Sequence, residues 1–217
     1  MQVIYEDNHV IVVNKPQGIP SQADKTGDID MLTMVKEYLK EKYNKPGNVY
    51  CGLVHRLDRS TAGLMMFAKT SKAASRLSEY IRNGDFKKEY LAVVCKKLPV
   101  GKTEVLEDYL LKDERNNISK VVGENTKGAK KAKLEYTVLK NTGKYSYIRV
   151  KLYTGRHHQI RVQMANIGNP LYGDTKYGGK KGSLALFACK ISTFHPTRDE
   201  ILEFELLPEK TGIWKEL

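Results

Sequence analysis

The chain of 217 residues is poor in cysteine, and its three cysteines, Cys51, Cys95 and Cys189, lie far apart. An odd number of widely spaced cysteines excludes a disulfide framework and the paired CxxC units of a zinc site. We therefore expect reduced, buried cysteines. Long apolar runs are also missing: no stretch of about 18 apolar residues occurs, and the first residues lack the basic and apolar regions of a secretory signal. These absences predict a soluble, cytoplasmic protein.

Acidic residues are scarce relative to basic ones. The chain has 25 Asp and Glu against 37 Lys and Arg, a formal net charge of +12. Such an excess matches the electrostatic footprint of a nucleic-acid binder, because Lys and Arg neutralise phosphates and release counterions. Basicity alone is weak evidence, since many basic proteins merely carry a solvated lysine-rich face. Hydrophobic residues make up 41% of the chain, enough for a substantial core, and we expect residues 1–217 to form one domain.

Strand and helix patterns follow one another without strict alternation. Helix patterns with capping residues occur over 31–39, after Asp28 or Asp30, and over 71–81, between Thr70 or Ser71 and Asn83-Gly84; a third runs over 157–167. Strand patterns cover residues 3–5, 10–13, 64–68, 89–94, 134–139, 145–153, 184–191 and 201–207. Many strands with a few helices predict an α+β fold on an extended mixed, mainly antiparallel sheet.

The stretch from Lys112 to Lys133 carries none of these patterns. It is polar, contains Asn116-Asn117, and ends in a lysine cluster made of Lys127, Lys130, Lys131 and Lys133. Such a composition predicts a mobile loop, which either faces RNA or is simply solvated.

A single acid, Asp58, stands among bases in the segment His55-Arg56-Leu57-Asp58-Arg59-Ser60-Thr61-Ala62-Gly63, between two apolar stretches. Charges between buried strands contribute little apolar burial and need partners or solvent, so they indicate an active site. Arg56 and Arg59 favour the ionised carboxylate, which can serve as nucleophile or base. The structural alternative is a turn cap or an ion pair with an arginine.

Two further motifs are candidates for binding. Tyr90 opens a strand directly after Lys87 and Lys88, which suits a stacked nucleobase over an anchored backbone, although a lone strand tyrosine is more often core. The adjacent His157 and His158 invite a metal site, but no HExxH pattern or acidic partner at ligand spacing accompanies them. Hydrogen bonding or packing is the better interpretation of the two histidines.

Together these motifs resemble an RluA-type RNA pseudouridine synthase over nearly the whole chain. The matching segments, in the same order, are Asn14-Lys15-Pro16-Gln17-Gly18, residues 55–63, Lys88-Glu89-Tyr90, Gly155-Arg156-His157-His158-Gln159-Ile160-Arg161, residues 166–174 and residues 184–188. The chain departs from the family at Ala62, where serine is usual, at His157, where threonine is usual, and at Gln163, Asn169 and Phe187, where histidine is usual. No S4 RNA-binding domain is expected, because a sheet segment begins at Val3.

The resemblance implies a pseudouridine synthase catalytic domain over residues 1–217. It implies that Asp58 is the essential aspartate, that Tyr90 stacks on the target uracil and that Arg161 pairs with Asp58. Arg56 is expected to enter the RNA stack left by the flipped nucleotide. The other predicted RNA-binding residues are His55, Arg59, Lys15, Lys87, Lys88 and Arg156.

The implied reaction isomerises uridine to pseudouridine in ribosomal or transfer RNA. It has no net redox change, so neither a cofactor nor a metal is expected; no protein partner is implied, and a monomer is compatible with the sequence. Asp58 either attacks C1′ or removes a proton from C2′, and both routes need the ionised carboxylate. One rival is a noncatalytic RNA-binding or RNA-chaperone protein. Another is a glycosidic-bond hydrolase, which usually needs a second catalytic carboxylate.

Overall fold

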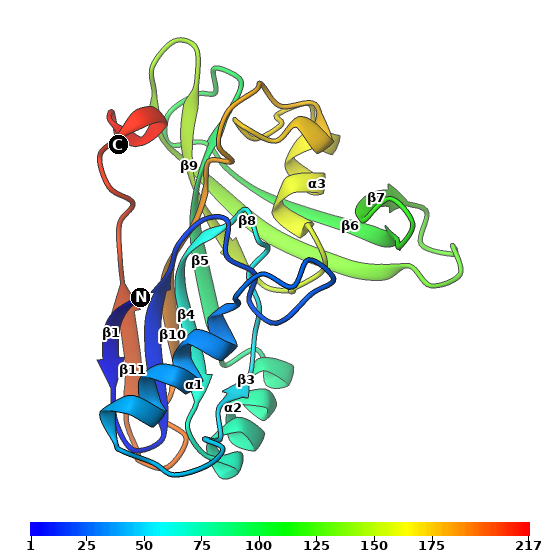
Figure 1. Ribbon diagram of the computed structural model, residues 1–217. Coiled ribbons are helices and arrows are strands. Elements are labelled where there is room, and N and C mark those ends of the chain that lie inside the picture. The colour runs from blue at the N-terminus through cyan, green and yellow to red at the C-terminus, as the bar shows by residue number, and fades with distance from the viewer. The chain divides into compact units, whose positions relative to one another are not determined.

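The structure is a computed structural model that describes residues 1–217, and it divides into two compact units (Figure 1). Unit 1 comprises Met1–Lys87 and Ala188–Leu207, and unit 2 comprises Lys88–Phe187 and Pro208–Leu217. The chain therefore passes between the units three times, and the single domain expected over residues 1–217 stays a prediction. Eleven strands and three α-helices confirm the α+β class. None of the helices is long and apolar enough to cross a membrane.

Unit 1 contains a sheet that begins with an antiparallel pair formed by the strands predicted over residues 3–5 and 10–13. Neighbouring strands follow the order β1-β2-β4-β10, with β3 paired to β4 and β11 paired to β10. Their bounds are β1 Gln2–Glu6, β2 Val10–Lys15, β3 Gly52–Leu53, β4 Ala62–Ala68, β10 Leu186–Phe194, whose first two residues belong to unit 2, and β11 Ile201–Glu205. Because β2 and β4 are antiparallel with Lys15 opposite Gly63, the end of β2 meets the end of the Asp58 segment.

Two capped helices complete unit 1. Helix α1 (Met31–Lys42) begins at Asp30, whose carboxylate accepts the Thr33 N–H at 3.1 Å. Helix α2 (Ser71–Asn83) is capped by Thr70 and ends at Gly84, which adopts the left-handed conformation with φ +82°. These caps satisfy backbone groups that a helix end leaves open, and they confirm the helix boundaries predicted from the sequence.

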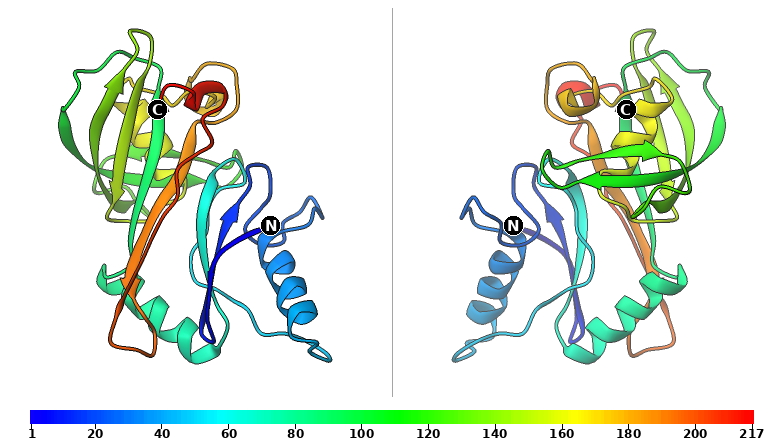
Figure 2. Two further views of the ribbon diagram at one scale, coloured as in Figure 1. Left: turned by 90° about the vertical axis from the view of Figure 1, so that its left-hand side faces the viewer. Right: turned by 90° about the vertical axis from the view of Figure 1, so that its right-hand side faces the viewer.

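The core of unit 1 uses both faces of β2 and β4. Side chains alternate between the two faces of a strand, so Val10, Val12, Leu64 and Met66 share one face, and they pack against α2. Ile11, Val13, Met65 and Phe67 point the other way and are also fully buried. Figure 2 shows α1 on the opposite side of these strands from α2. Lys15 and Gly63 thus lie at the ends of two strands that are buried on both faces.

Unit 2 contains a second run of antiparallel neighbours in the order β5-β9-β8-β6-β7. The short helix α3 (Gln159–Asn166) packs on β6 and β8 where Val162 meets Leu110 and Ala132. Two 3₁₀ turns follow, η1 Thr175–Tyr177 and η2 Gly212–Trp214. The strands are β5 Lys87–Val94, whose first residue belongs to unit 1, β6 Thr103–Asp113, β7 Ile118–Val122, β8 Lys130–Asn141 and β9 Ser146–Leu152.

The prediction of a mobile loop from Lys112 to Lys133 is wrong. Half of this stretch is sheet: it ends β6, forms β7 and begins β8. The β6–β7 turn is fixed because Asp113 accepts bonds from the backbone and side chain of Asn116, while Asn117 adopts a positive φ of 48°. A polar composition misled the prediction, since these strands bury only alternate residues and expose the rest to solvent.

Candidate active-site residues

The Asp58 segment is irregular backbone between β3 and β4, anchored by its buried neighbour Leu57. The Leu57 N–H donates to Ser21 Oγ at 3.0 Å, and Ser21 Oγ donates to the Leu57 carbonyl at 2.6 Å. Immediately afterwards the Thr61 N–H donates to the Asp58 carbonyl at 2.9 Å, which closes a turn. Asp58 itself is partly exposed. The carboxylate therefore stands on backbone that is fixed on both sides.

Gly63 ends this segment at a position that only glycine fits. Its φ is +115°, and a Cβ there would lie 2.3 Å from the carbonyl oxygen of Ala188 in β10. The first strand residues after Asp58 thus run against the backbone of the neighbouring strand. This close approach determines where the Asp58 segment leaves the sheet.

Lys15 is fully buried and bonded to the Asp58 segment. Its Nζ donates to the carbonyls of Pro16 at 3.0 Å and Arg59 at 3.2 Å. Burial lowers the pKa of the Lys15 ammonium to about 8, although the negative charge of Asp58 opposes that shift. The charged end of Lys15 thus lies inside unit 1, bonded to the backbone of the Asp58 segment, and the RNA contact predicted for Lys15 stays a prediction.

Arg59 and His55 also make contacts within unit 1. The Arg59 guanidinium donates to the Gly18 carbonyl at 2.9 Å and forms an ion pair with Asp28, so it ties the segment after β2 to the residue next to Asp58. His55 is buried, and its Nε2 accepts the Met66 N–H at 3.0 Å. In contrast, Arg56 and Lys87 are exposed. RNA binding by these four residues stays a prediction.

In unit 2, Tyr90 lies in β5 opposite Val150 and is only 6% exposed. Lys88 is two residues earlier and therefore on the same face of the strand. Burial lowers the pKa of Lys88. A Cβ on Gly155 would lie 3.4 Å from the Lys88 Nζ, which places this lysine beside the loop that leads to α3. The predicted aromatic residue and one predicted cation thus share one face of β5.

Arg161 is buried in α3 and forms a two-bond ion pair. Its Nε and one Nη donate to the two carboxylate oxygens of Asp174, each at 2.7 Å, and its guanidinium lies 5.2 Å from the centre of the Tyr177 ring. A guanidinium has five N–H donors, so this contact does not preclude a second carboxylate. The predicted pairing of Arg161 with Asp58 stays a prediction.

Helix α3 starts later than predicted. His158 is its N-cap residue in the left-handed conformation, with φ 53°, so His157 precedes the helix and does not share a helical face with Arg161. The two histidine rings stack with centroids 3.8 Å apart, and they bond to Ser119 and Tyr177. Nowhere in the chain do three or more His, Cys, Asp or Glu residues come together as metal ligands. All three cysteines are free, with Cys51 and Cys189 buried and Cys95 partly exposed.

Two lysines of β8 share one acid on β6. Glu107 lies between Lys131, at 3.1 Å, and Lys133, at 2.6 Å. Arg156, the predicted RNA contact nearest to them, is exposed and donates from its Nε to the Lys131 carbonyl at 2.9 Å. One acid balances only one of these two lysine charges, and RNA binding by the lysine cluster stays untested.

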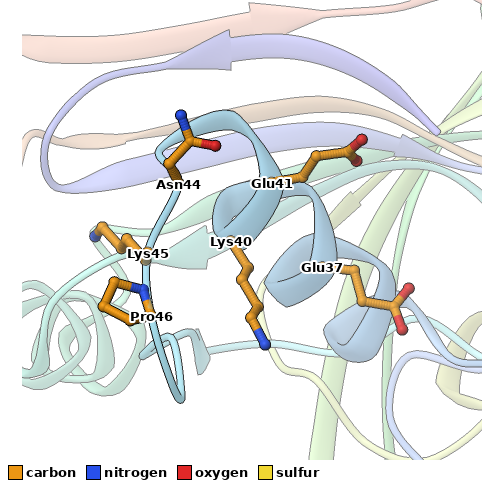
Figure 3. Close-up of a pocket in the computed structure, with 6 residues that line it drawn as sticks. All are labelled: Glu37, Lys40, Glu41, Asn44, Lys45 and Pro46. Atoms are coloured by element: carbon orange, nitrogen blue, oxygen red, sulfur yellow. The ribbon is translucent and has the colours of Figure 1, made fainter.

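A shallow hollow on the surface has none of the predicted site residues in its lining. Figure 3 shows it at the C-terminal end of α1, where its lining residues are Glu37, Lys40, Glu41, Asn44, Lys45 and Pro46. Two acids and two lysines balance its charge. Neither its charge nor its lining favours a phosphate.

The fold of the chain is that of solved RNA pseudouridylate synthases. It superposes on human RNA pseudouridylate synthase domain containing 4 with a TM-score of 0.79 over 96% of this chain and 89% of that one, at 22% identity. For human RNA pseudouridylate synthase domain containing 1 the TM-score is 0.74, over 96% and 83%, at 23% identity. At these identities the likeness shows the fold alone.

Sequence similarity shows the family. The RNA pseudouridylate synthase family matches residues 9–166, and the chain belongs to it. Ribosomal large subunit pseudouridine synthase D of Yersinia pestis is 32% identical, covering 96% of this chain and 68% of that protein. An uncharacterized RNA pseudouridine synthase of Aquifex aeolicus is 33% identical, covering 97% and 70%. The chain is therefore an isomerase of the pseudouridine synthase class, and the matched range contains Asp58, Tyr90 and Arg161.

Three residues that the motifs did not assign take part in these contacts. Asp174 and Tyr177 hold Arg161, and Ser21 holds the backbone beside Asp58. Asp174 stands in a segment that resembles the family, yet its spacing of 13 residues from Arg161 gives no local signal of an ion pair. The buried contacts of Ser21 and Leu57 join residues 36 apart, which no periodicity indicates.

Proposed function

We propose that this protein converts uridine to pseudouridine in RNA, with Asp58 as the residue that acts on the ribose. The family match over residues 9–166 carries this proposal, because it spans all three predicted catalytic residues. Asp58 acts in its ionised form, either by attack on C1′ or by removal of the C2′ proton. The C1′–N1 bond breaks, the uracil turns, and C5 bonds to C1′, so no atom is gained or lost.

We propose that Tyr90 stacks on the flipped uracil and that Arg161 pairs with Asp58. A pseudouridine synthase must take its target base out of the stack, and stacking on an aromatic ring offsets part of that cost. A cation beside Asp58 favours its charged form. The exposed Arg56 is the best placed of the basic residues around Asp58 to fill the space left in the RNA, since Lys15 and His55 are buried and the Arg59 guanidinium is bonded to Gly18 and Asp28.

The names of the relatives support a substrate class to test first. Because relatives are called ribosomal large subunit pseudouridine synthase D, large-subunit ribosomal RNA is the first substrate to test, with transfer RNA as the second. The net charge of +12 supports an RNA partner of either kind.

The deciding experiment replaces Asp58 with Asn and maps pseudouridines in RNA treated with each protein. We expect the wild-type chain to form pseudouridine and Asp58→Asn to bind the same RNA without forming any, because the amide cannot act as nucleophile or base. Pseudouridine formed by Asp58→Asn at the wild-type rate would contradict the proposal. RNA binding by the wild-type chain with no isomerisation would support the noncatalytic alternative, and released uracil would support a hydrolase.

A further inference from the structure

We propose that Asp174 and Tyr177 are positioning residues, which hold the Arg161 guanidinium in one orientation for the reaction. The inference rests on the proposed function, because it takes Arg161 to act on Asp58. All of the residues involved belong to unit 2, and neither Asp174 nor Tyr177 was among the predicted site residues.

Asp174 fixes the plane of the guanidinium. Two parallel bonds of 2.7 Å join Arg161 Nε and Nη to the two carboxylate oxygens, and the side chains are 7% and 1% exposed. Paired bonds of this kind set both the position and the rotation of the arginine. A lysine, which is a point charge on a flexible stem, would not be oriented in the same way.

The Asp174 backbone is itself held in a tight loop. The Asp174 carbonyl accepts the N–H groups of Tyr177, at 3.1 Å, and of Gly179, at 2.8 Å. The loop depends on glycine, because a Cβ on Gly173 would lie 2.1 Å from the Ser183 carbonyl oxygen. The carboxylate therefore arrives at Arg161 from a backbone that has little freedom.

Tyr177 supports the guanidinium from its face. The ring centre lies 5.2 Å from the Arg161 Cζ, and the hydroxyl accepts the Ser119 N–H of β7 at 2.7 Å and bonds with His158 Nδ1 at 2.9 Å. Burial, helped by the charge of Arg161, lowers the pKa of His158 to about 2, so this imidazole is neutral. Three separate elements, β7, the start of α3 and η1, thus fix the ring on which Arg161 lies.

The Arg161–Asp174 pair is better explained by a need to orient the guanidinium than by a contribution to folding stability. A buried ion pair recovers little more than its desolvation cost, and apolar residues of the same size often stabilise a protein better. What the pair provides is a cation whose direction is set before any substrate binds. Donors and charges fixed in advance need no rearrangement during a reaction.

The test measures single-turnover pseudouridine formation and RNA affinity separately, with the full chain and large-subunit ribosomal RNA. We expect Asp174→Asn to lower the rate constant by at least about tenfold while the Kd for RNA changes less than about threefold, because misorientation affects the reaction more than binding. The double variant Arg161→Lys with Asp174→Asn should be no slower than Arg161→Lys alone. The matched control Asp7→Asn removes a largely buried acid of unit 1 and should lower thermal stability but leave the rate constant unchanged.

Three results would overturn the inference: an unchanged rate constant in folded Asp174→Asn, a loss confined to Kd, or multiplied losses in the double variant. If Asp174→Asn does not fold, the Tyr177 variants decide. Tyr177→Phe keeps the ring and should retain more of the rate than Tyr177→Leu, and equal full activity in both would also overturn it. If the wild-type chain forms no pseudouridine on ribosomal or transfer RNA, both the proposed function and this inference are overturned. If the wild-type chain is active, the variants of Asp174 and Tyr177 test this inference alone.

Discussion

At the scale of single residues, substitutions of Tyr90 can separate the contribution of its ring to activity from that of its hydroxyl. We predict that Tyr90→Phe retains most activity, because stacking needs only the ring. Tyr90→Ala should lose about 1–3 kcal/mol of stacking, which corresponds to a loss of roughly 5- to 150-fold. Single-turnover rates on ribosomal RNA measure the difference.

Truncating a buried tyrosine also leaves a cavity, so this comparison needs a control in the same unit. Tyr136→Ala removes a fully buried ring from β8 and should lower thermal stability without lowering the rate of the folded fraction. Equal losses in Tyr90→Phe and Tyr90→Ala would contradict stacking and indicate a catalytic hydroxyl instead.

The site residues differ in how far the sequence alone revealed them. Asp58 stood out because its basic neighbours are contiguous with it and because packing could not explain them. The burial of Lys15 was not predictable, since a Lys-Pro pair in a turn is normally solvated, and only the register of Lys15 opposite Gly63 places its ammonium under the Asp58 segment. The Arg161–Asp174 pair depends on a tertiary loop, for which the sequence has no periodic signal.

At the scale of elements, the contact between the backbones of β4 and β10 predicts that two glycines with positive φ differ greatly in how much stability their replacement by alanine costs. Gly63→Ala would place a Cβ 2.3 Å from the Ala188 carbonyl oxygen, whereas Gly18→Ala meets nothing within 4 Å. We expect about 1 kcal/mol of lost stability for Gly18→Ala, from backbone strain alone, and several kcal/mol for Gly63→Ala. Urea unfolding followed by fluorescence measures both.

Gly63→Ala should also reduce pseudouridine formation, because the Asp58 segment must shift to relieve the clash. Equal stabilities for Gly63→Ala and Gly18→Ala would show that β10 moves away at little cost. The close approach of the two backbones would then not determine the position of Asp58.

Elements with strong local signals were predicted well, and elements without them were not. Capping residues marked α1 and α2, and short apolar runs marked β2, β4 and β5. At the end of β6 and in β7 few positions are buried, so composition suggested a loop there. What makes them strands is pairing with neighbours, a property that appears only when the chain is folded.

At the scale of the whole molecule, the net charge of +12 does not mean that every basic side chain is available to bind phosphate. Cross-strand pairs neutralise Lys133 with Glu107, Lys151 with Glu135 and Arg149 with Glu89. These side chains lie along one sheet of unit 2, and a cation beside an acid attracts phosphate less than an exposed cation without one. RNA affinity should therefore depend more on exposed residues such as Arg56 and Lys87 than on the lysine cluster of β8.

Acid stability is a property of the whole chain that two carboxylates of unit 1 should control. Burial alone would raise the pKa of Glu6, but hydrogen bonds from Lys42, Lys69, Tyr43 and Tyr38 lower it from 4.5 to about 2. Burial likewise opposes the shift of Asp7, yet bonds from the backbone of Val10 and His9 and from the side chains of His195 and Tyr5 lower its pKa from 3.8 to about 2.

The sign of the effect follows from these two depressed values. Between about pH 2 and pH 4.5 the unfolded chain binds more protons at Glu6 and Asp7 than the folded chain does, so their contribution is complete above that range and is lost as the pH falls through it. We predict that the urea midpoint of the wild-type chain falls across this window. The midpoint of Glu6→Gln with Asp7→Asn should start lower and fall less steeply, while Asp199→Asn, which removes an exposed carboxylate, should keep the wild-type slope. Parallel curves for the wild type and the double variant would mean that acid unfolding of this protein is controlled by other carboxylates.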